Sequence, residues 1–406
     1  MPEDIEMNHG SNNTKFGLII NGQRTPVPRS FPVLDPISQR EIHLAPSADE
    51  SDALEAVKAA EVAFETWRDS TPLERRTIML KAADIIRERS DEIAAAMVQE
   101  TGAKKSWASF NIETCVQLIH EAAAMATQIK GELLQSNSRV DAFLEAGLPD
   151  GVLNYICCPR NVAPSVTETM IGHSAVQRVN FTGSTAVGRM IATVCARYLK
   201  PAILELGGKA PMVILKDANL EEAVRAAAFG AMQHQGQICM STERIIVHKS
   251  IFAKFSELFA IKINSMRAAD PSKDGTATLG SLISPTAGTR FEKLVTDALS
   301  KGAKVRGGKP GFEGAVVQPI VLEGVSKGMD VYYQESFGPM VSLFEFETAQ
   351  EAIDLANDTE YGLVCSVFSE NISEALAVGR RIRSGSCHIN GATVHGESIK
   401  TRFKKA

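Results

Sequence analysis

The chain has 406 residues, which is longer than one hydrophobic core usually spans, so two domains are expected. Hydrophobic residues make up 44% of the chain and charged residues 22%, as in an average soluble globular protein. The formal net charge of −5 gives no indication of a nucleic-acid or membrane partner, and the seven cysteines lack metal-ligand spacing, so they predict a reducing, cytoplasmic compartment and no metal site.

The N-terminal part of the chain is predicted to be mainly helical. Residues 1–16 are polar and are expected to form a flexible tail without a signal peptide. Apolar residues 17–20, followed by Asn21-Gly22, predict a strand that enters a type I′ hairpin turn. Within residues 71–74, Thr71 can cap a helix and Glu74 can close a capping box. Helices are predicted over residues 49–67, 71–89, 91–101 and 107–133.

The second half of the chain alternates between strands and helices, after a short helix that ends at Gly147. Such alternation predicts parallel sheets with crossover helices. The predicted strands cover residues 152–157, 176–181, 202–206, 212–215, 244–248, 316–322, 340–346, 363–368 and 385–390. The predicted helices cover residues 163–172, 185–199, 220–233, 251–266, 285–300, 349–357 and 373–382.

Cys239 is the candidate nucleophile, because it lies in a loop flanked by glycine and glutamine, where side chains are usually presented to a ligand. A preceding helix C-terminus does not lower a thiol pKa, so activation has to come from backbone N–H groups or a nearby base. The alternative is an inert core cysteine. His234, nearest to it among the histidines, is expected to have a surface or capping role.

Glu205 is the candidate base, because it stands near the carboxyl end of a buried strand, where an unpaired carboxylate is costly. A raised pKa would suit a general base that acts on water. The alternative is a carboxylate that accepts hydrogen bonds from neighbouring backbone N–H groups. The following Gly207-Gly208 allows another backbone or a ligand to come close.

Two further loops are candidates for binding. The turn from Gly183 and Ser184 to Gly188 joins a strand to a helix, and free N–H groups there can hold an anion such as a diphosphate; a plain βα turn is the alternative. In the loop at residues 334–339, Glu335 could hold a ribose and Phe337 could flank a ring; the alternative is a turn with a buried phenylalanine.

Taken together, these motifs resemble the aldehyde dehydrogenase superfamily, and the likeness runs in the same order from about residue 16 to residue 390. The form of residues 207–211, Gly-Gly-Lys-Ala-Pro, is closest to the branch that acts on aromatic aldehydes such as salicylaldehyde or vanillin. The motifs are Phe-Thr-Gly-Ser at 181–184, Leu-Glu-Leu-Gly-Gly-Lys at 204–209, Gly-Gln-x-Cys at 236–239, Glu-Ser-Phe-Gly-Pro at 335–339 and Asn-Asp-Thr-Glu-Tyr-Gly-Leu at 357–363.

The resemblance implies a two-domain α/β fold and oxidation of an aldehyde with NAD or NADP. The Cys239 thiolate would form a thiohemiacetal and then a thioester, and Glu205 would activate the water that releases the acid. Glu335 would hold the nicotinamide ribose, with Phe337 near the ring. The residues implied beside the rest of the cofactor are Gly183, Ser184, Gly188 and Leu206.

The resemblance also implies four parts of the chain: a tail over 1–16, a Rossmann-like cofactor domain with its N-terminal helical block over 17–206, a catalytic domain over 207–391, and a divergent tail over 392–406. The sequence departs from the family pattern in two places. Nothing between residues 131 and 148 matches the family's first cofactor strands or its oxyanion-stabilising asparagine, so a deletion is predicted near 136–146. The family's final strand is also absent, which predicts a weakened homo-oligomer.

Two other functions stay open from the sequence. A catalytically impaired relative could act as a binding or assembly protein, because the missing segments remove an oxyanion donor and part of the nucleotide shelf. A cofactor-independent thiol esterase would need only Cys239 and Glu205. A wrongly joined gene would account for the deletion without any functional consequence.

Overall fold

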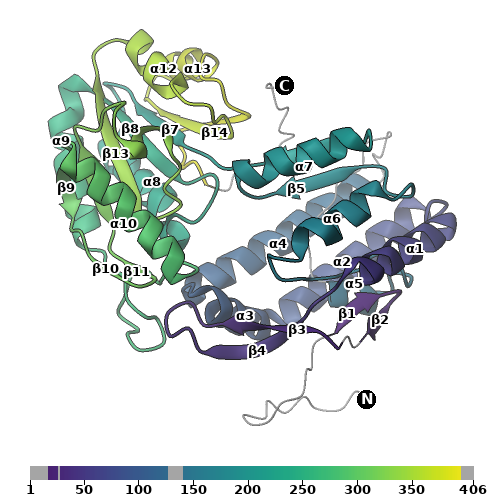
Figure 1. The fold of residues 1–406 in the computed structure, drawn as a ribbon. Coiled ribbons are helices and arrows are strands. Elements are labelled where there is room, and N and C mark those ends of the chain that lie inside the picture. Colours follow the sequence, from purple (N-terminus) through teal and green to yellow (C-terminus); the bar gives the residue numbers. More distant parts are fainter. Residues whose placement is uncertain (1–16, 26–27, 127–139, 395–406) are drawn as a thin grey trace.

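The computed structural model describes residues 17–25, 28–126 and 140–394. The predicted tail at 1–16, residues 136–139 of the predicted deletion site and most of the tail at 392–406 lie outside the described residues. Figure 1 shows two lobes: an N-terminal lobe that contains β1 to β6 and α1 to α7, and a C-terminal lobe that contains β7 to β15. In the part of the chain described, no helix is long and apolar enough to cross a membrane.

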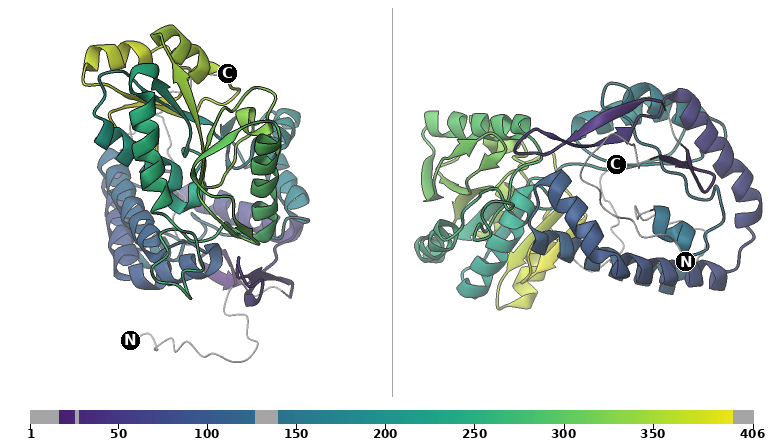
Figure 2. Two further views of the ribbon diagram at one scale, coloured as in Figure 1. Left: turned by 90° about the vertical axis from the view of Figure 1, so that its left-hand side faces the viewer. Right: turned by 90° about the horizontal axis from the view of Figure 1, so that it is seen from below.

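Two hairpins open the N-terminal lobe. β1 (Leu18–Ile20) pairs with β2 (Gln23–Thr25), and Asn21 and Gly22 both have positive φ, at 51° and 73°, which confirms the predicted turn. The hairpin of β3 (Ser30–Leu34) and β4 (Glu41–Pro46) was not predicted. Figure 2 shows this second hairpin reaching from the N-terminal lobe toward the C-terminal lobe.

The predicted helical block is confirmed. Thr71 and Glu74 form the expected capping box, with the Glu74 N–H donating to Thr71 Oγ1 at 3.2 Å and the Thr71 N–H donating to Glu74 Oε2 at 2.7 Å. The predicted helix at 107–133 ends at Met125 within the described residues. The helices are α1 (Glu50–Trp67), α2 (Pro72–Glu88), α3 (Ser90–Thr101), α4 (Lys105–Met125) and α5 (Val140–Glu145).

The sheet of the N-terminal lobe that carries site residues has two described strands. β5 (Val179–Thr182) and β6 (Ala202–Glu205) are parallel, and α6 (Ala163–Gly172) and α7 (Thr185–Arg197) belong to the same lobe. The strand predicted at 152–157 is wrong. Tyr155 instead exchanges two backbone hydrogen bonds of 2.8 Å with Ile19, because Ile156 and Cys157 pack on the small core beneath β1.

The C-terminal lobe contains a seven-stranded sheet in the order β15-β14-β7-β8-β13-β12-β9. All neighbours are parallel except β9, which is antiparallel to β12. The strand predicted at 316–322 is divided into β11 and β12, and β9 was not predicted. The sheet consists of β7 (Ala210–Ile214), β8 (Thr242–His248), β9 (Lys304–Gly308), β12 (Ile320–Glu323), β13 (Met340–Phe346), β14 (Val364–Phe368) and β15 (Ser386–Ile389).

Helices cover both faces of this sheet. α8 (Leu220–Met232) and α9 (Lys249–Asn264) pack on one face around Phe255 and Phe259. α12 (Ala349–Asn357) and α13 (Ile372–Gly379) pack on the other, beside α10 (Pro285–Ser300). Because both faces are buried, β7 and β14 are buried along their whole length, and β7 reads as an unbroken apolar run while β14 is interrupted by Ser366. The remaining elements are η2 (Gln233–Gly236), β10 (Phe312–Glu313), β11 (Val316–Val317) and α11 (Asp330–Tyr333).

Candidate active site

Four loops lie side by side at one edge of the seven-stranded sheet. β14, β7, β8 and β13 are adjacent and parallel, so their amino ends meet at the same edge. Gly208 directly precedes β7, and Cys239 precedes β8. Glu335 precedes β13, and Gly362 precedes β14. The fold therefore gathers on one edge four motifs that are far apart in the sequence.

The two-stranded sheet contributes its carboxyl ends to the same place. Thr182 pairs with Glu205 at the ends of β5 and β6, and the Gly183 N–H donates to the Glu205 carbonyl at 3.0 Å. The chain then passes from Glu205 into β7 through only four residues. The carboxyl ends of parallel strands are the usual position of ligands in α/β proteins. Glu205 thus comes from one sheet and Cys239 from the other.

Glycines allow the three central loops to touch. A Cβ on Gly208 would lie 2.0 Å from the Cys239 carbonyl oxygen, and one on Gly236 would lie 2.2 Å from the Gly338 carbonyl oxygen. Neither position has room for a side chain. Gln237 is buried and ties the cysteine loop to the segment before α10, because its Oε1 accepts from the Ile283 N–H at 2.8 Å. In the Gly-Gln-x-Cys motif, Gly236 therefore allows the close contact with the loop before β13, and Gln237 holds the loop that carries the thiol.

The Cys239 thiol is half-buried and electrostatically coupled to two carboxylates. Burial raises its pKa, and the charges of Glu335 and Glu205 raise it further. Hydrogen bonds from the backbone N–H groups of Cys239 and Met240 act in the opposite direction. These N–H groups are the backbone donors expected from the sequence, but burial and the two carboxylates outweigh their effect on the pKa of the thiol.

The Glu205 carboxylate has no hydrogen-bond partner among the residues described, although its side chain is half-buried. Desolvation raises its pKa above the usual range. The alternative in which neighbouring backbone N–H groups hold this carboxylate is therefore not what the structure shows. A desolvated carboxylate with a raised pKa beside a thiol fits a general base.

Glu335 reaches the loop before β7. Its Oε1 accepts from the Gly208 N–H at 2.8 Å, and Oε2 has no partner within the described ranges. Burial raises the pKa of Glu335 to about 7. Phe337, two residues on, is 37% exposed, so the alternative of a buried phenylalanine is wrong. Its φ of 47° lies in the left-handed region, which a phenylalanine rarely adopts.

A buried ion pair that the sequence did not reveal holds this loop. Glu243, on β8, forms an ion pair with Lys209, and both side chains are almost fully buried. The Glu243 carboxylate also accepts from the Ser336 N–H at 2.8 Å and the Phe337 N–H at 3.2 Å. Arg290 donates to the Ser336 carbonyl at 3.3 Å and to the Glu335 carbonyl. The only sequence signal was a charged residue inside an apolar strand.

In the turn at residues 183–188, which leads into α7, some of the backbone N–H groups already donate to partners within the protein. Ser184 caps α7, with the Val187 N–H donating to its Oγ at 3.4 Å. The Gly183 N–H is already bonded to Glu205, so it is not free for an anion. A Cβ on Gly188 would lie 2.5 Å from Leu206, so this glycine lets α7 pack over the end of β6. The βα-turn alternative therefore explains Gly183 and Gly188, and Leu206 packs against Gly188.

His234 has neither the surface nor the capping role expected. Its φ is 47°, within a left-handed run that continues through Gln235 and Gly236. Its ring stacks on Trp107 with centroids 5.4 Å apart and an interplanar angle of 9°. Burial lowers its pKa to about 4, so the imidazole is neutral at pH 7. Phe110 lies beside Trp107, with centroids 5.5 Å apart.

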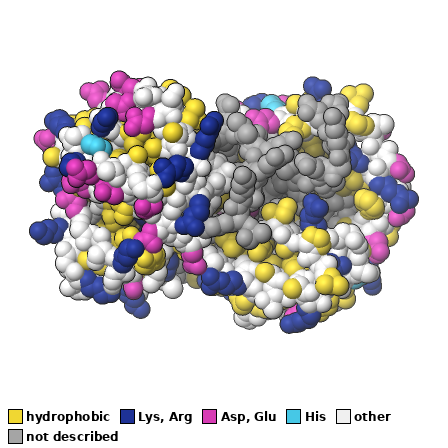
Figure 3. Space-filling model, turned by 90° about the horizontal axis from the view of Figure 1, so that it is seen from above, with side chains coloured by type: hydrophobic (Ala, Val, Ile, Leu, Met, Phe, Trp, Pro, Cys, Tyr) yellow, Lys and Arg dark blue, Asp and Glu magenta, His cyan; other side chains and the backbone are white. Residues whose placement is uncertain are grey.

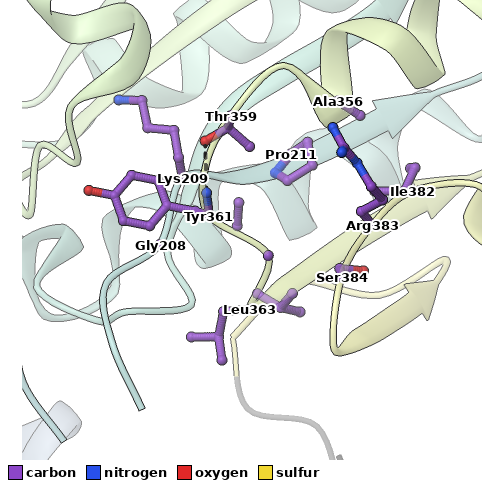
Figure 4. Close-up of a pocket in the computed structure, with 13 residues that line it drawn as sticks. Gly208, Lys209, Pro211, Ala356, Thr359, Tyr361, Leu363, Ile382, Arg383 and Ser384 are labelled. Carbon is purple, nitrogen blue, oxygen red and sulfur yellow. Dashed lines mark hydrogen bonds between the residues drawn. The ribbon is translucent and has the colours of Figure 1, made fainter. Parts of the chain in front are cut away.

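A small pocket lies where the loops before β7 and β14 meet. Figure 4 shows the lining residues, which include Lys209 and Pro211 at the start of β7 and Thr359, Tyr361 and Leu363 from the loop before β14. Its volume of about 10 Å³ admits no more than a water molecule. Tyr361 also feels the charge of Glu335, which adds to the burial that raises its pKa. The two loops therefore pack closely against each other, and the space between them is too small for a substrate.

Charge and metal-ligand patterns agree with the composition. On the face seen in Figure 3, Lys and Arg side chains are interspersed with Asp and Glu rather than gathered in one patch. Over the ranges that the structure describes, no group of His, Cys, Asp and Glu could hold a metal ion.

The chain is similar to known proteins in sequence and in fold. The profile described as "Aldehyde dehydrogenase family" matches residues 24–143 and 138–403. The chain is 41% identical to a vanillin dehydrogenase from Pseudomonas sp., with 91% of this chain and 88% of the relative covered. It is 30% identical to a benzaldehyde dehydrogenase [NAD(+)] from Pseudomonas putida, with 90% and 85% covered. The crystal structure of a salicylaldehyde dehydrogenase from Pseudomonas putida G7 complexed with salicylaldehyde superposes with a TM-score of 0.89 at 35% identity, covering 94% of this chain and 91% of that one.

Proposed function

The chain belongs to the aldehyde dehydrogenase family, and we propose that it oxidises an aromatic aldehyde to the carboxylic acid with NAD⁺ or NADP⁺, using Cys239 as nucleophile and Glu205 as base. One observation carries this proposal. The charges of Glu335 and Glu205, two desolvated carboxylates, act on the Cys239 thiol at the edge where the carboxyl ends of β5 and β6 meet the amino ends of β7, β8 and β13.

The residues at this edge fit a nicotinamide dinucleotide. Glu335 keeps one carboxylate oxygen without a partner in the described part of the chain, so it can accept from ribose hydroxyls. Phe337 presents an exposed ring beside it. When bound, such a cofactor supplies the hydride acceptor of the reaction. Ser184, which caps α7, would contact the diphosphate in this proposal.

The chain's own groups carry the covalent steps. Because the pKa of the Cys239 thiol is raised, it is largely protonated at pH 7, and Glu205 can take up its proton as the sulfur adds to the carbonyl carbon. The backbone N–H groups at Cys239 and Met240 stabilise negative charge next to the sulfur. After the hydride leaves, a thioester joins the acyl group to Cys239. Glu205 then activates the water that releases the acid.

Aromatic side chains next to the cysteine loop favour an aromatic substrate. His234, five residues before Cys239, stacks on Trp107, which packs on Phe110. Phe229, at the end of α8, meets Phe110 edge to face with centroids 6.4 Å apart. Flat rings of this kind favour another flat ring through offset or edge contacts. The named specificities of the vanillin and benzaldehyde relatives point the same way.

A shortened cofactor domain over residues 17–206 is part of the proposal, and two findings support it. The family profile matches in two segments that meet at residues 138–143, where the deletion is predicted. The alignment with the vanillin dehydrogenase extends over 427 residues although it includes 91% of a 406-residue chain, so part of that relative has no counterpart here. Sequencing the transcript across codons 136–146 distinguishes a true deletion from a wrongly joined gene.

A catalytically impaired relative is the second candidate, and the exposed two-stranded sheet favours it. Ile203, on β6, is 43% exposed, whereas strands beside a bound dinucleotide are normally covered. The decisive measurement is NAD(P)H formation from vanillin, salicylaldehyde and benzaldehyde, with Cys239→Ala as the control. Turnover above that control supports the enzyme, and equal rates support the impaired relative.

A further inference from the structure

We propose that Glu243, neutralised by Lys209, is the positioning residue of the loop at residues 335–337, and that it sets where Glu335 and Phe337 meet the nicotinamide end of the cofactor. The inference rests on the proposed function for the identity of the ligand. The starting observation is that one buried carboxylate holds two consecutive backbone N–H groups and one ammonium group.

The geometry of Glu243 is that of a clamp. Its two oxygens accept from the Ser336 N–H at 2.8 and 3.0 Å, and one of them also accepts from the Phe337 N–H at 3.2 Å. The second oxygen receives the Lys209 ammonium. Hydrogen bonds to a charged acceptor are stronger than neutral ones. Glu243 therefore fixes the backbone immediately after Glu335.

The loop needs such a clamp because it is strained. Phe337 has φ 47°, a conformation disfavoured by its Cβ, and it persists only when surrounding contacts impose it. Arg290 holds the same loop from the other side through the carbonyls of Glu335 and Ser336. With N–H groups held by Glu243 and carbonyls held by Arg290, the backbone that carries Glu335 is fixed, and its side chain accepts from the Gly208 N–H at 2.8 Å.

Lys209 explains why a carboxylate can be buried here. Its side chain is 1% exposed and that of Glu243 is 4% exposed, so each charge needs the other. Lys209 directly follows Gly208, whose N–H binds Glu335. The ion pair thus ties the loop before β7 to the loop before β13. Stability alone does not account for the pair, since replacing buried ion pairs by apolar residues often leaves stability unchanged.

Two variants test the clamp. In Glu243→Gln, the amide NH₂ would face the Lys209 ammonium or a loop N–H, so donors meet donors. In the double variant Glu243→Leu with Lys209→Met, no charge is left unpaired, so the fold is retained while the loop loses its acceptors. Glu323→Gln is the matched control, because Glu323 lies in the same sheet on β12, two strands from β8, and contacts Ser256 and Arg306.

The first readout is the dissociation constant for NAD⁺ and NADP⁺ by calorimetry. We expect an increase of roughly tenfold to a hundredfold in both test variants, as for loss of hydrogen bonds to a charged group, and no change in the control. The KM for the cofactor rises and the KM for the aldehyde does not. A purely structural role would lower thermal stability without this split.

The second readout needs neither cofactor nor turnover, so it separates failure of the clamp from failure of the proposed function. Iodoacetamide labelling of Cys239, followed by mass spectrometry, reports the charge of Glu335 beside the thiol. Displacement of Glu335 would remove that charge and speed labelling severalfold at pH 7. If the folded variants keep the wild-type labelling rate and, where the wild type binds it, the wild-type cofactor affinity, Glu243 is not a positioning residue.

Discussion

The two parallel sheets that meet at the active site differ in how completely they are covered. The seven-stranded sheet has helices on both faces, and Ile214 on β7 is fully buried. The two described strands β5 and β6 contain only exposed and half-buried positions, and Ile203 on β6 is 43% exposed. The first sheet supplies a rigid edge, while the second supplies one carboxylate and one helix start.

Because of this difference, the proposed nucleophile and the proposed cofactor-binding surface lie on sheets with different cover. Cys239, Glu335 and the clamp at Glu243 all belong to the complete sheet, where buried contacts fix the loops. Glu205 and Ser184 belong to the sheet with little cover. We therefore expect the nucleophile to be well positioned and the cofactor shelf to limit the reaction.

The largest expected effect tests the nucleophile on the complete sheet. Cys239→Ser should lower the rate of NAD(P)H formation by on the order of 10⁴-fold or more, because the serine hydroxyl is a far weaker nucleophile than the thiolate. Steady-state assays with vanillin measure the loss. Retention of more than a small fraction of the wild-type rate would place the reacting group elsewhere.

The next effect tests the residue that the sparse sheet contributes. Glu205→Gln should lower turnover by roughly 10²- to 10⁴-fold, because a general base is lost while the side chain keeps its shape. Quenched mass spectra should then show an acyl group accumulating on Cys239. If the acyl group does not accumulate and turnover is unchanged, water is activated by another group.

The two sheets can be compared directly by making the same change, isoleucine to alanine, in each of them. Ile214→Ala should lower the free energy of unfolding by about 2–5 kcal/mol, because it leaves a cavity in the core. Ile203→Ala, on the exposed strand, should cost less than about 1 kcal/mol. Urea unfolding of both variants measures the difference. Equal losses would mean that β6 is covered in solution, for example by a second copy of the chain.

The smallest effect concerns the pH dependence of cofactor binding. The pKa of Glu335 is raised to about 7, so its carboxyl is protonated below that pH and ionised above it. The ionised form accepts from ribose hydroxyls, so affinity for NAD(P)⁺ should rise as the pH increases from about 6 to about 8, by no more than about tenfold per unit. Calorimetry across this range measures it, and Glu335→Gln should remove the dependence.

The ionisation of Glu335 also changes the free energy of unfolding with pH, in the direction opposite to its effect on cofactor affinity. Its folded pKa lies above the ordinary value of 4.5, so the folded state binds more protons between about pH 4.5 and 7. Stability from this group is therefore present at low pH and is lost as the pH rises through about 7. A cofactor that forms hydrogen bonds with the ionised carboxylate should restore the stability that is lost at high pH.

Local patterns in the sequence determined most helices and strands and the candidate catalytic groups. The capping box at Thr71 and Glu74, the helix Pro285–Ser300 and the strand Met340–Phe346 depend on residues a few positions apart, and all are confirmed. Cys239, Glu205 and Glu335 stood out because a reactive or charged residue occurred next to glycine or at the end of an apolar run. Their roles in catalysis stay a proposal.

Only the tertiary structure decided which distant groups meet. The pairing of Lys209 with Glu243, the stacking of His234 on Trp107 and the contact of Tyr155 with Ile19 join residues that no local pattern relates. The order of strands in the parallel sheet places the loops before β7, β8 and β13 side by side. Such contacts depend on how crossover connections arrange the strands, and hydrophobic periodicity carries no information about that order.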